Sequence, residues 1–246
     1  MANRRKIRKK KQRSRVANWL INIGLILLLV VGLALVFNNQ IKNFLIKQNG
    51  ESYAIASYTS KQLEENKNKD TTFDFEGVES ISTEAVLRAQ FANKRLPIIG
   101  GIAIPSVKIN LPIFNGLSNE ALLWGAGTMS PDQIMGQGNY GLASHRAYEP
   151  DLLFTPLENV KTGEKIYITD LKNIYTYTTT VKRQVEPTEV EVLDVVEGKK
   201  LITLVTCAEI EGINRIVVQG ELESITSVDK ASETMVKAFE IEQKTY

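Results

Sequence analysis

Hydrophobic residues are distributed unevenly along the chain, and the longest apolar run lies near its start. Residues 16–41 contain no charged side chain, and the centre of this stretch, Trp19 to Phe37, is almost wholly apolar. A run of this length is long enough to cross a bilayer as a helix. The sequence therefore predicts a transmembrane helix within residues 16–41.

From residue 97 onward the pattern changes to short runs of β-forming residues, separated by Gly, Pro and polar turns. These runs cover residues 98–105, 109–114, 140–144, 165–169, 174–185, 201–207 and 216–222. In the run 174–185, apolar and aromatic residues alternate as they do in a half-buried strand. Short strands with few long helices are typical of a closed or nearly closed β-barrel. We therefore expect a mostly β fold.

Three short helices accompany the predicted strands. Ser82 or Thr83 is a typical N-cap for a helix that continues through Asn93. Ser130 followed by Pro131 is a favourable cap and first-turn pair for a second helix. The charged residues 226–246 accommodate a short amphipathic helix around positions 235–239.

Between the apolar run and the predicted barrel, the sequence is polar. Residues 62–74 are rich in charged and amide side chains and have no sustained apolar face. Such a segment is expected to be mostly solvated, with short helical turns, and it carries no candidate chemistry. The chain is accordingly divided into a basic tail, a signal anchor, a stalk, a catalytic domain and a tail, at residues 1–15, 16–41, 42–81, 82–225 and 226–246.

Two consecutive strands place a cysteine next to an arginine. The run Leu201–Cys207 ends on the only cysteine in 246 residues, and Arg215 opens the next strand after a seven-residue loop. Strands joined by so short a loop form an antiparallel hairpin in the simplest case. Cys207 and Arg215 should therefore be neighbours. The guanidinium could stabilise a thiolate, or an oxyanion formed when the thiol attacks a carbonyl.

Charge is as unevenly distributed as hydrophobicity. Residues 1–15 hold nine of the 30 Lys and Arg residues and no acidic residue, so the rest of the chain carries 21 basic and 28 acidic side chains. This acidic balance argues against nucleic-acid binding by the main domain. Nine cations before the apolar run predict a cytoplasmic N-terminus, with residues beyond the span outside the cell. No small-x-small cleavage site follows the run, which favours an uncleaved signal anchor.

A single cysteine and a single histidine restrict the chemistry further. They exclude an internal disulfide and any multi-cysteine zinc or iron–sulfur site, and they argue against a histidine-based metal site. A thiol nucleophile needs a proton-transfer partner, and His145 follows the predicted strand 140–144. Taken singly, Cys207, His145 and Arg215 each fit an inert buried or surface residue equally well or better. Their shared position at strand ends favours catalysis.

These residues lie in motifs that resemble a known family. The run Thr203-Leu204-Val205-Thr206-Cys207, with Arg215 eight residues later and Leu142-Ala143-Ser144-His145 upstream, resembles the signature of sortases. Sortases are membrane-anchored cysteine transpeptidases of Gram-positive bacteria. The resemblance covers about residues 82–225. The N-terminal anchor, the lack of a C-terminal span and the lack of a lid-like insertion resemble class A.

The resemblance implies an eight-stranded sortase β-barrel and a transpeptidase that recognises a Leu-Pro-any-Thr-Gly signal near the C-terminus of secreted proteins. Cys207 would attack the Thr carbonyl and form a thioacyl enzyme. His145 would act as general acid for the leaving Gly amine and then as base for the incoming amine. Arg215 would stabilise the oxyanion or clamp the substrate backbone. The acceptor would be an amino group of the peptidoglycan precursor lipid II, so that the product is a wall-anchored protein.

The resemblance also implies an apolar pocket for the Leu-Pro part of the signal. The matching positions, for which ordinary barrel core is an equally good reading, are Ala143, Val185, Val190, Val192, Leu193 and Val205. Some class A sortases bind calcium through several acidic residues beside the groove. Residues 116–128 offer only Glu120, so we expect neither calcium dependence nor another cofactor.

Two other functions remain open from the sequence. A thiol hydrolase would use the same nucleophile with water as the acceptor, and only an acceptor assay distinguishes it from a transpeptidase. A catalytically silent wall-binding module on a membrane stalk would keep its function after Cys207→Ala.

Overall fold

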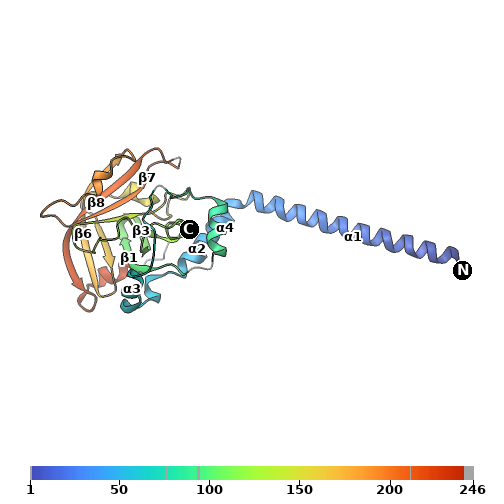
Figure 1. Ribbon diagram of the computed structural model, residues 1–246, viewed down its shortest axis with the longest axis horizontal. Helices are drawn as coiled ribbons and strands as arrows, with labels where there is room; N and C mark the ends of the chain where they lie inside the picture. The colour runs from blue at the N-terminus through green and yellow to red at the C-terminus, as the bar shows by residue number, and fades with distance from the viewer. Residues whose placement is uncertain (1, 76, 93–94, 211, 241–246) are drawn as a thin grey trace. The chain divides into compact units, whose positions relative to one another are not determined.

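The computed structural model describes residues 2–75, 77–92, 95–210 and 212–240 (Figure 1). The chain divides into two compact units, residues 1–42 and 43–246. Most of the first unit is helix α1 (Ala2–Val36). Its segment Arg15–Val36 has a mean hydropathy of 2.7 and none of it is buried within the protein, so it is long and apolar enough to cross a membrane. Helix α2 (Asn38–Glu51) follows directly.

The second unit is built on a closed barrel of eight strands, as the sequence predicted. The strands follow one another around the barrel in the order β1-β2-β3-β4-β7-β8-β6-β5. Figure 1 shows β6, β7 and β8 as neighbours, with β8 in the middle by its pairing. The strands are β1 (Ile98–Ile104), β2 (Ile109–Phe114), β3 (Ala126–Thr128), β4 (Asn139–Ala143), β5 (Lys165–Thr169), β6 (Asn173–Val185), β7 (Leu201–Cys207) and β8 (Arg215–Ser227).

The barrel interior is filled by alternate residues of these strands. Ile102 on β1 lies opposite Ile168 on β5 where the barrel closes, and both are fully buried. Two of the largest buried side chains, Tyr140 and Tyr177, lie in the same core. The hydroxyl of Tyr177 accepts a hydrogen bond of 3.0 Å from the backbone N–H of Gly136, so its polar end is satisfied inside the core. This packed interior fixes the register of the strands. The register in turn decides which residues lie at the ends of the barrel.

Short helices and 3₁₀ turns lie before, between and after the strands. Helix α4 (Thr83–Phe91) begins as predicted, because the Ser82 hydroxyl accepts the backbone N–H of Ala85 at 3.0 Å. Asn93, where this helix was expected to end, lies outside the described residues. The others are α3 (Ser60–Lys67), α5 (Asn119–Trp124), α6 (Glu233–Ala238) and the 3₁₀ turns Ile55–Ser57, Pro105–Val107, Thr155–Asn159, Val190–Leu193 and Val228–Lys230.

The helix predicted at Ser130-Pro131 does not form, and residues 130–138 make turns instead. The side chain of Gln133 explains the difference. Its amide donates to the carbonyl of Gly141 at 2.9 Å and accepts from the N–H of the same residue at 3.3 Å. The segment is therefore held along β4 by a side-chain pairing that a helix would break.

Residues 62–74 are mostly exposed, as expected, and include the end of the short helix α3, but individual side chains in and before this segment are buried. Leu63 on α3 is 1% exposed and Ile55 is 3% exposed, and both pack in a cluster with Phe114 and Trp124. The side chain of Asn66 donates to the carbonyl of Ile98 on β1 at 2.8 Å. Ile55 lies in the short run 53–58 and Leu63 is isolated among polar residues, so neither belongs to a sustained periodic face that would have revealed its burial. Residues from 43 onward share one compact unit with the barrel.

Candidate active site

The hairpin of β7 and β8 places Cys207 directly opposite Arg215, which confirms the predicted arrangement. The antiparallel register runs without interruption from Leu201 to this pair. Because β8 also pairs with β6, Arg215 lies opposite Val185 on its other side. Two ladders of backbone hydrogen bonds therefore fix the position from which the guanidinium projects.

A glutamate folds the loop between β7 and β8. The carboxylate of Glu209 accepts the backbone N–H of Asn214 at 2.9 Å, and the N–H of Ala208 donates to the carbonyl of Asn214 at 2.9 Å. The hydrogen bond from the Asn214 backbone is the main reason that the pKa of Glu209 is lowered. The loop is thus closed by an ionised side chain at neutral pH, immediately beside the cysteine.

The guanidinium of Arg215 is anchored on this loop. Its Nη1 donates to the carbonyls of Gly212 at 2.8 Å and Asn214 at 3.1 Å. Gly212 has a φ of +71°, and a Cβ added there would lie 3.8 Å from both Arg215 Nη1 and Cys207 Sγ. Among the described residues, no hydrogen-bond partner is found for Arg215 Nε or Nη2.

His145 follows strand β4 and lies at the barrel end where β7 ends at Cys207. Strand β4 runs parallel to β7 with Ala143 opposite Val205, and the N–H of Ser144 continues the ladder to the carbonyl of Val205 at 3.2 Å. Continuing this register by two residues brings His145 level with Cys207. Side chains two residues apart point to the same face of a strand. The fold therefore gathers the three predicted residues at one barrel end.

Burial controls the charge of the imidazole. His145 is 9% exposed, and burial lowers its pKa to about 4. The described residues provide no ion pair for the ring that would offset this loss of solvation. At neutral pH the imidazole is uncharged and has a lone pair that can accept a proton.

An apolar cavity of about 170 Å³ adjoins Arg215. Five of the six predicted pocket residues line it, namely Val185, Val190, Val192, Leu193 and Val205, and Arg215 lines it as well. Val205 and Val217 form the pair two residues along the strands from the Cys207–Arg215 pair, and therefore lie on the same face of the hairpin. The cavity is therefore continuous with the position of the guanidinium.

The sixth predicted pocket residue, Ala143, is not in the cavity lining. It packs in a neighbouring cluster with Leu117 and Leu122. Leu117 does line the cavity, as do Met129, Val217 and Phe75, none of which the sequence analysis named. Strand alternation from Arg215 would have indicated Val217. No sequence pattern connects Phe75, which lies in the expected stalk, with this cavity.

A metal site finds no support in the part of the chain that the structure describes. Those residues contain no group of three or more His, Cys, Asp or Glu side chains placed to hold an ion. Glu120 lies in the first turn of α5. Calcium independence stays a prediction.

Comparison with known proteins agrees with this geometry. Residues 102–223 match the family model described as the sortase domain. Sortase A of Streptococcus agalactiae is 47% identical over 238 residues, covering 95% of this chain and 96% of that protein. Sortase A of Listeria monocytogenes is 41% identical over 209 residues, covering 85% of this chain and 94% of that protein. A crystal structure of the Listeria protein superposes with a TM-score of 0.54 at 43% identity, covering 58% of this chain and 97% of the other.

These relatives match nearly their full lengths, and the barrel, the anchor-like helix and the single-cysteine hairpin are all present in this chain. Sortases are cysteine transpeptidases that sort proteins to the cell wall. This chain belongs to the sortase family, in its class A.

Proposed function

We propose that this transpeptidase cleaves a Leu-Pro-any-Thr-Gly signal between Thr and Gly and joins the Thr carboxyl group to an amine of a peptidoglycan precursor. The observation that carries the proposal is the end of the barrel where Cys207 lies opposite Arg215, level with His145, beside an apolar cavity. A nucleophile, a proton carrier, an oriented cation and a binding pocket are the parts that acyl transfer requires.

In the first half-reaction, the Cys207 sulfur attacks the Thr carbonyl carbon while the neutral imidazole of His145 accepts the thiol proton. The carbonyl oxygen becomes an oxyanion, and Arg215 donates to it through Nε and Nη2. His145 then gives the proton to the Gly nitrogen, and the C–N bond breaks. The lowered pKa of His145 supports this step, because burial makes the imidazolium a stronger acid than usual.

In the second half-reaction, the amine of the acceptor attacks the thioacyl carbon, and His145 takes a proton from the attacking nitrogen. The C–S bond breaks, an amide forms, and the sulfur regains its proton. Water in place of the amine would give the hydrolase reaction. The same residues support both outcomes, so the acceptor decides between them.

The apolar cavity supports recognition of the Leu-Pro portion of the signal. Its walls are mainly valine and leucine side chains, and its volume of about 170 Å³ is suited to a single branched aliphatic side chain. Arg215 is in the same lining and is paired with Cys207 across the hairpin, which supports binding of the peptide near the sulfur.

The charge distribution supports an orientation in the membrane. Eight cations precede the candidate span Arg15–Val36 and a ninth, Arg15, begins it, which supports a cytoplasmic N-terminus and a catalytic unit on the outer face. Secreted proteins and the cell-wall precursor amine are both available on that side. The basic tail is adjacent to the anionic inner leaflet in this orientation.

The test uses the full chain in detergent with a Leu-Pro-any-Thr-Gly peptide and a glycine-based amine. Mass spectrometry should show loss of the C-terminal Gly fragment and gain of the amine. Cys207→Ala is the control and should give neither product. Cleavage without amine incorporation would establish a hydrolase instead, and an uncleaved peptide would contradict the proposed signal.

A further inference from the structure

One wall of the apolar cavity comes from outside the barrel. Phe75, in the segment between α3 and α4, lines the cavity together with Val185, Val205 and Val217 from three strands. Its side chain is 40% exposed. The protein covers this large aromatic side chain only in part, so the ring has surface left to bury against a ligand in the pocket.

The segment before Phe75 is attached to the loop that follows β2. The Thr71 hydroxyl donates to the carbonyl of Asn115 at 2.6 Å, and the N–H of Leu117 donates to the carbonyl of Thr72 at 2.7 Å. The residue between these two loop positions is Gly116, with a φ of +84°. A Cβ there would lie 2.1 Å from Thr71 Oγ1 and 2.5 Å from the Thr72 oxygen. The close approach therefore requires glycine at this position.

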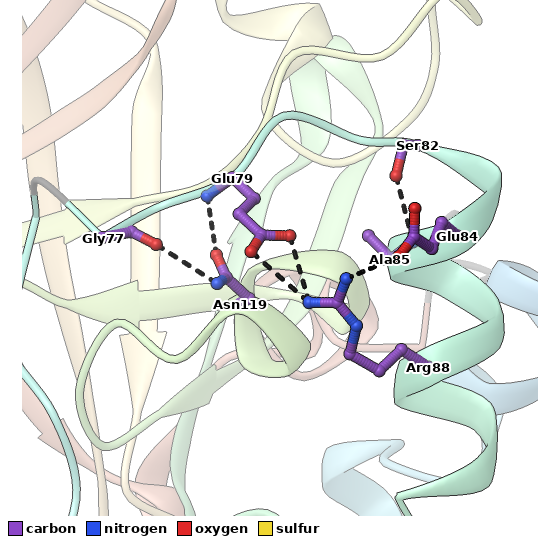
Figure 2. Close-up of polar contacts among 7 residues, drawn as sticks. All are labelled: Gly77, Glu79, Ser82, Glu84, Ala85, Arg88 and Asn119. Carbon is purple, nitrogen blue, oxygen red and sulfur yellow. Dashed lines mark hydrogen bonds and ion pairs between the residues drawn. The ribbon is translucent and has the colours of Figure 1, made fainter.

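The segment after Phe75 is held by a second set of contacts, shown in Figure 2. Asn119, at the start of α5, accepts the N–H of Glu79 at 2.8 Å and donates to the carbonyl of Gly77 at 3.2 Å. Arg88 on α4 pairs with the Glu79 carboxylate at 3.4 Å and with Glu84 at 3.0 Å. The chain is thus fixed to the barrel on both sides of Phe75.

We propose that Phe75 is a substrate-contacting residue of this transpeptidase and forms an outer wall of the apolar pocket. Asn119 acts as its positioning residue. This inference rests on the proposed function, and it assigns part of signal recognition to a segment outside the barrel. The anchored backbone makes Phe75 a fixed wall: a cavity of about 170 Å³ stays open beside the ring.

The test measures steady-state transpeptidation by the full chain in detergent while the Leu-Pro-any-Thr-Gly peptide is varied. Phe75→Ala should raise KM about five- to tenfold and change kcat less than about twofold, because the lost contact is made equally in the bound and transition states. Phe75→Leu should recover most of the affinity. Phe91→Ala is the matched control, since Phe91 is 80% exposed on α4 and does not line the cavity.

Asn119→Ala tests the positioning role. It should raise KM in the same direction by a smaller factor. In the double variant with Phe75→Ala, it should add almost nothing, because Asn119 acts through Phe75. Additive effects in the double variant would show that Asn119 does not act through Phe75 and would overturn that part of the proposal.

A second peptide separates recognition from any loss of folded protein. Replacing the peptide Leu by Ala should lower kcat/KM for the unaltered protein by a larger factor than for Phe75→Ala, and a ratio within one variant does not depend on the folded fraction. An equal factor in both proteins overturns the proposal. An unchanged KM in Phe75→Ala also overturns the proposal. A lowered KM overturns it as well, because the ring would then obstruct the pocket. Failure of the proposed function would look different, because then the unaltered protein would not process the peptide.

Discussion

The barrel end that carries Cys207 and the segment that carries Phe75 are positioned in opposite ways. Cys207 and Arg215 are set by continuous strand ladders, in which each residue is fixed by its neighbours. Phe75 is held by a few separate contacts, such as those of Thr71 and Asn119 with distant loops. The first kind of positioning follows from a repeating sequence pattern, and the second depends on individual side chains that no local pattern reveals.

The largest expected effect tests the chemistry of the ladder-positioned end. Cys207→Ala should abolish peptide cleavage and thioacyl formation, and His145→Ala should come close, because the sequence holds no second residue of either kind. Mass spectrometry of the protein after mixing with peptide detects the thioacyl adduct. Circular dichroism confirms that the barrel is intact. Substantial transpeptidation by either variant would remove that residue from the mechanism.

Arg215→Lys tests whether the two ladders serve to orient a guanidinium. The charge survives this change, but the planar fork with its donors in fixed directions does not. We expect a loss of about a hundred- to a thousandfold in kcat, close to that of Arg215→Ala, as is typical for an oxyanion donor. Steady-state kinetics of both variants measures it. A lysine variant that keeps most of its activity would reduce Arg215 to a diffuse positive charge.

The burial of His145 predicts a dependence of stability on pH. Its pKa is lowered from 6.5 to about 4 in the folded protein, so between these values the unfolded chain binds more protons. The free energy of unfolding should therefore fall as the pH falls from about 6.5 to about 4, by up to about 3 kcal/mol from this residue. Urea unfolding of residues 43–246 at several pH values measures the slope.

The variant His145→Gln removes the titrating ring from that comparison. Its free energy of unfolding should decrease less over the same pH range, while the carboxylates contribute equally to both proteins. Identical slopes in the two proteins would mean that the imidazole is solvated and that this barrel end is more open than the structure has it.

Leu63→Ala tests the packing of α3, in the part of the chain that is held to the barrel by separate contacts. Its expected effect is the smallest of the four predictions made in this Discussion. Leu63 is 1% exposed, and its truncation should lower the free energy of unfolding by about 2–3 kcal/mol. Leu87→Ala on α4, where the side chain is 40% exposed, is the matched control and should change it by less than about 0.5 kcal/mol. Equal effects of the two changes, measured by urea unfolding, would show that α3 is detached in solution.

The sequence predicted what its repeating patterns determine. The hairpin pattern placed Cys207 next to Arg215 correctly, and the short, numerous strands indicated the barrel. The family resemblance supplied the pocket positions, of which Ala143 proved to pack beside the cavity.

The sequence failed where one side chain decides the structure. Ser130-Pro131 has the local features of a helix start, yet the pairing of Gln133 with Gly141 on another element prevails. Residues 62–74 read as solvated and mostly are, but Leu63 within them is buried against partners that lie far along the chain. Such contacts between distant residues leave no periodic trace in the sequence.

The parallel pairing of β4 with β7 also has a consequence for how the protein matures. Parallel neighbours cannot be joined by a tight turn, and here β5 and β6 intervene between the two strands in the chain. Contacts between residues so distant in sequence form slowly, because a long loop must be closed first. His145 therefore comes level with Cys207 only when β4 and β7 have paired. Under the proposed function, a chain whose barrel has not yet closed would hold the nucleophile without its proton carrier and should not catalyse acyl transfer.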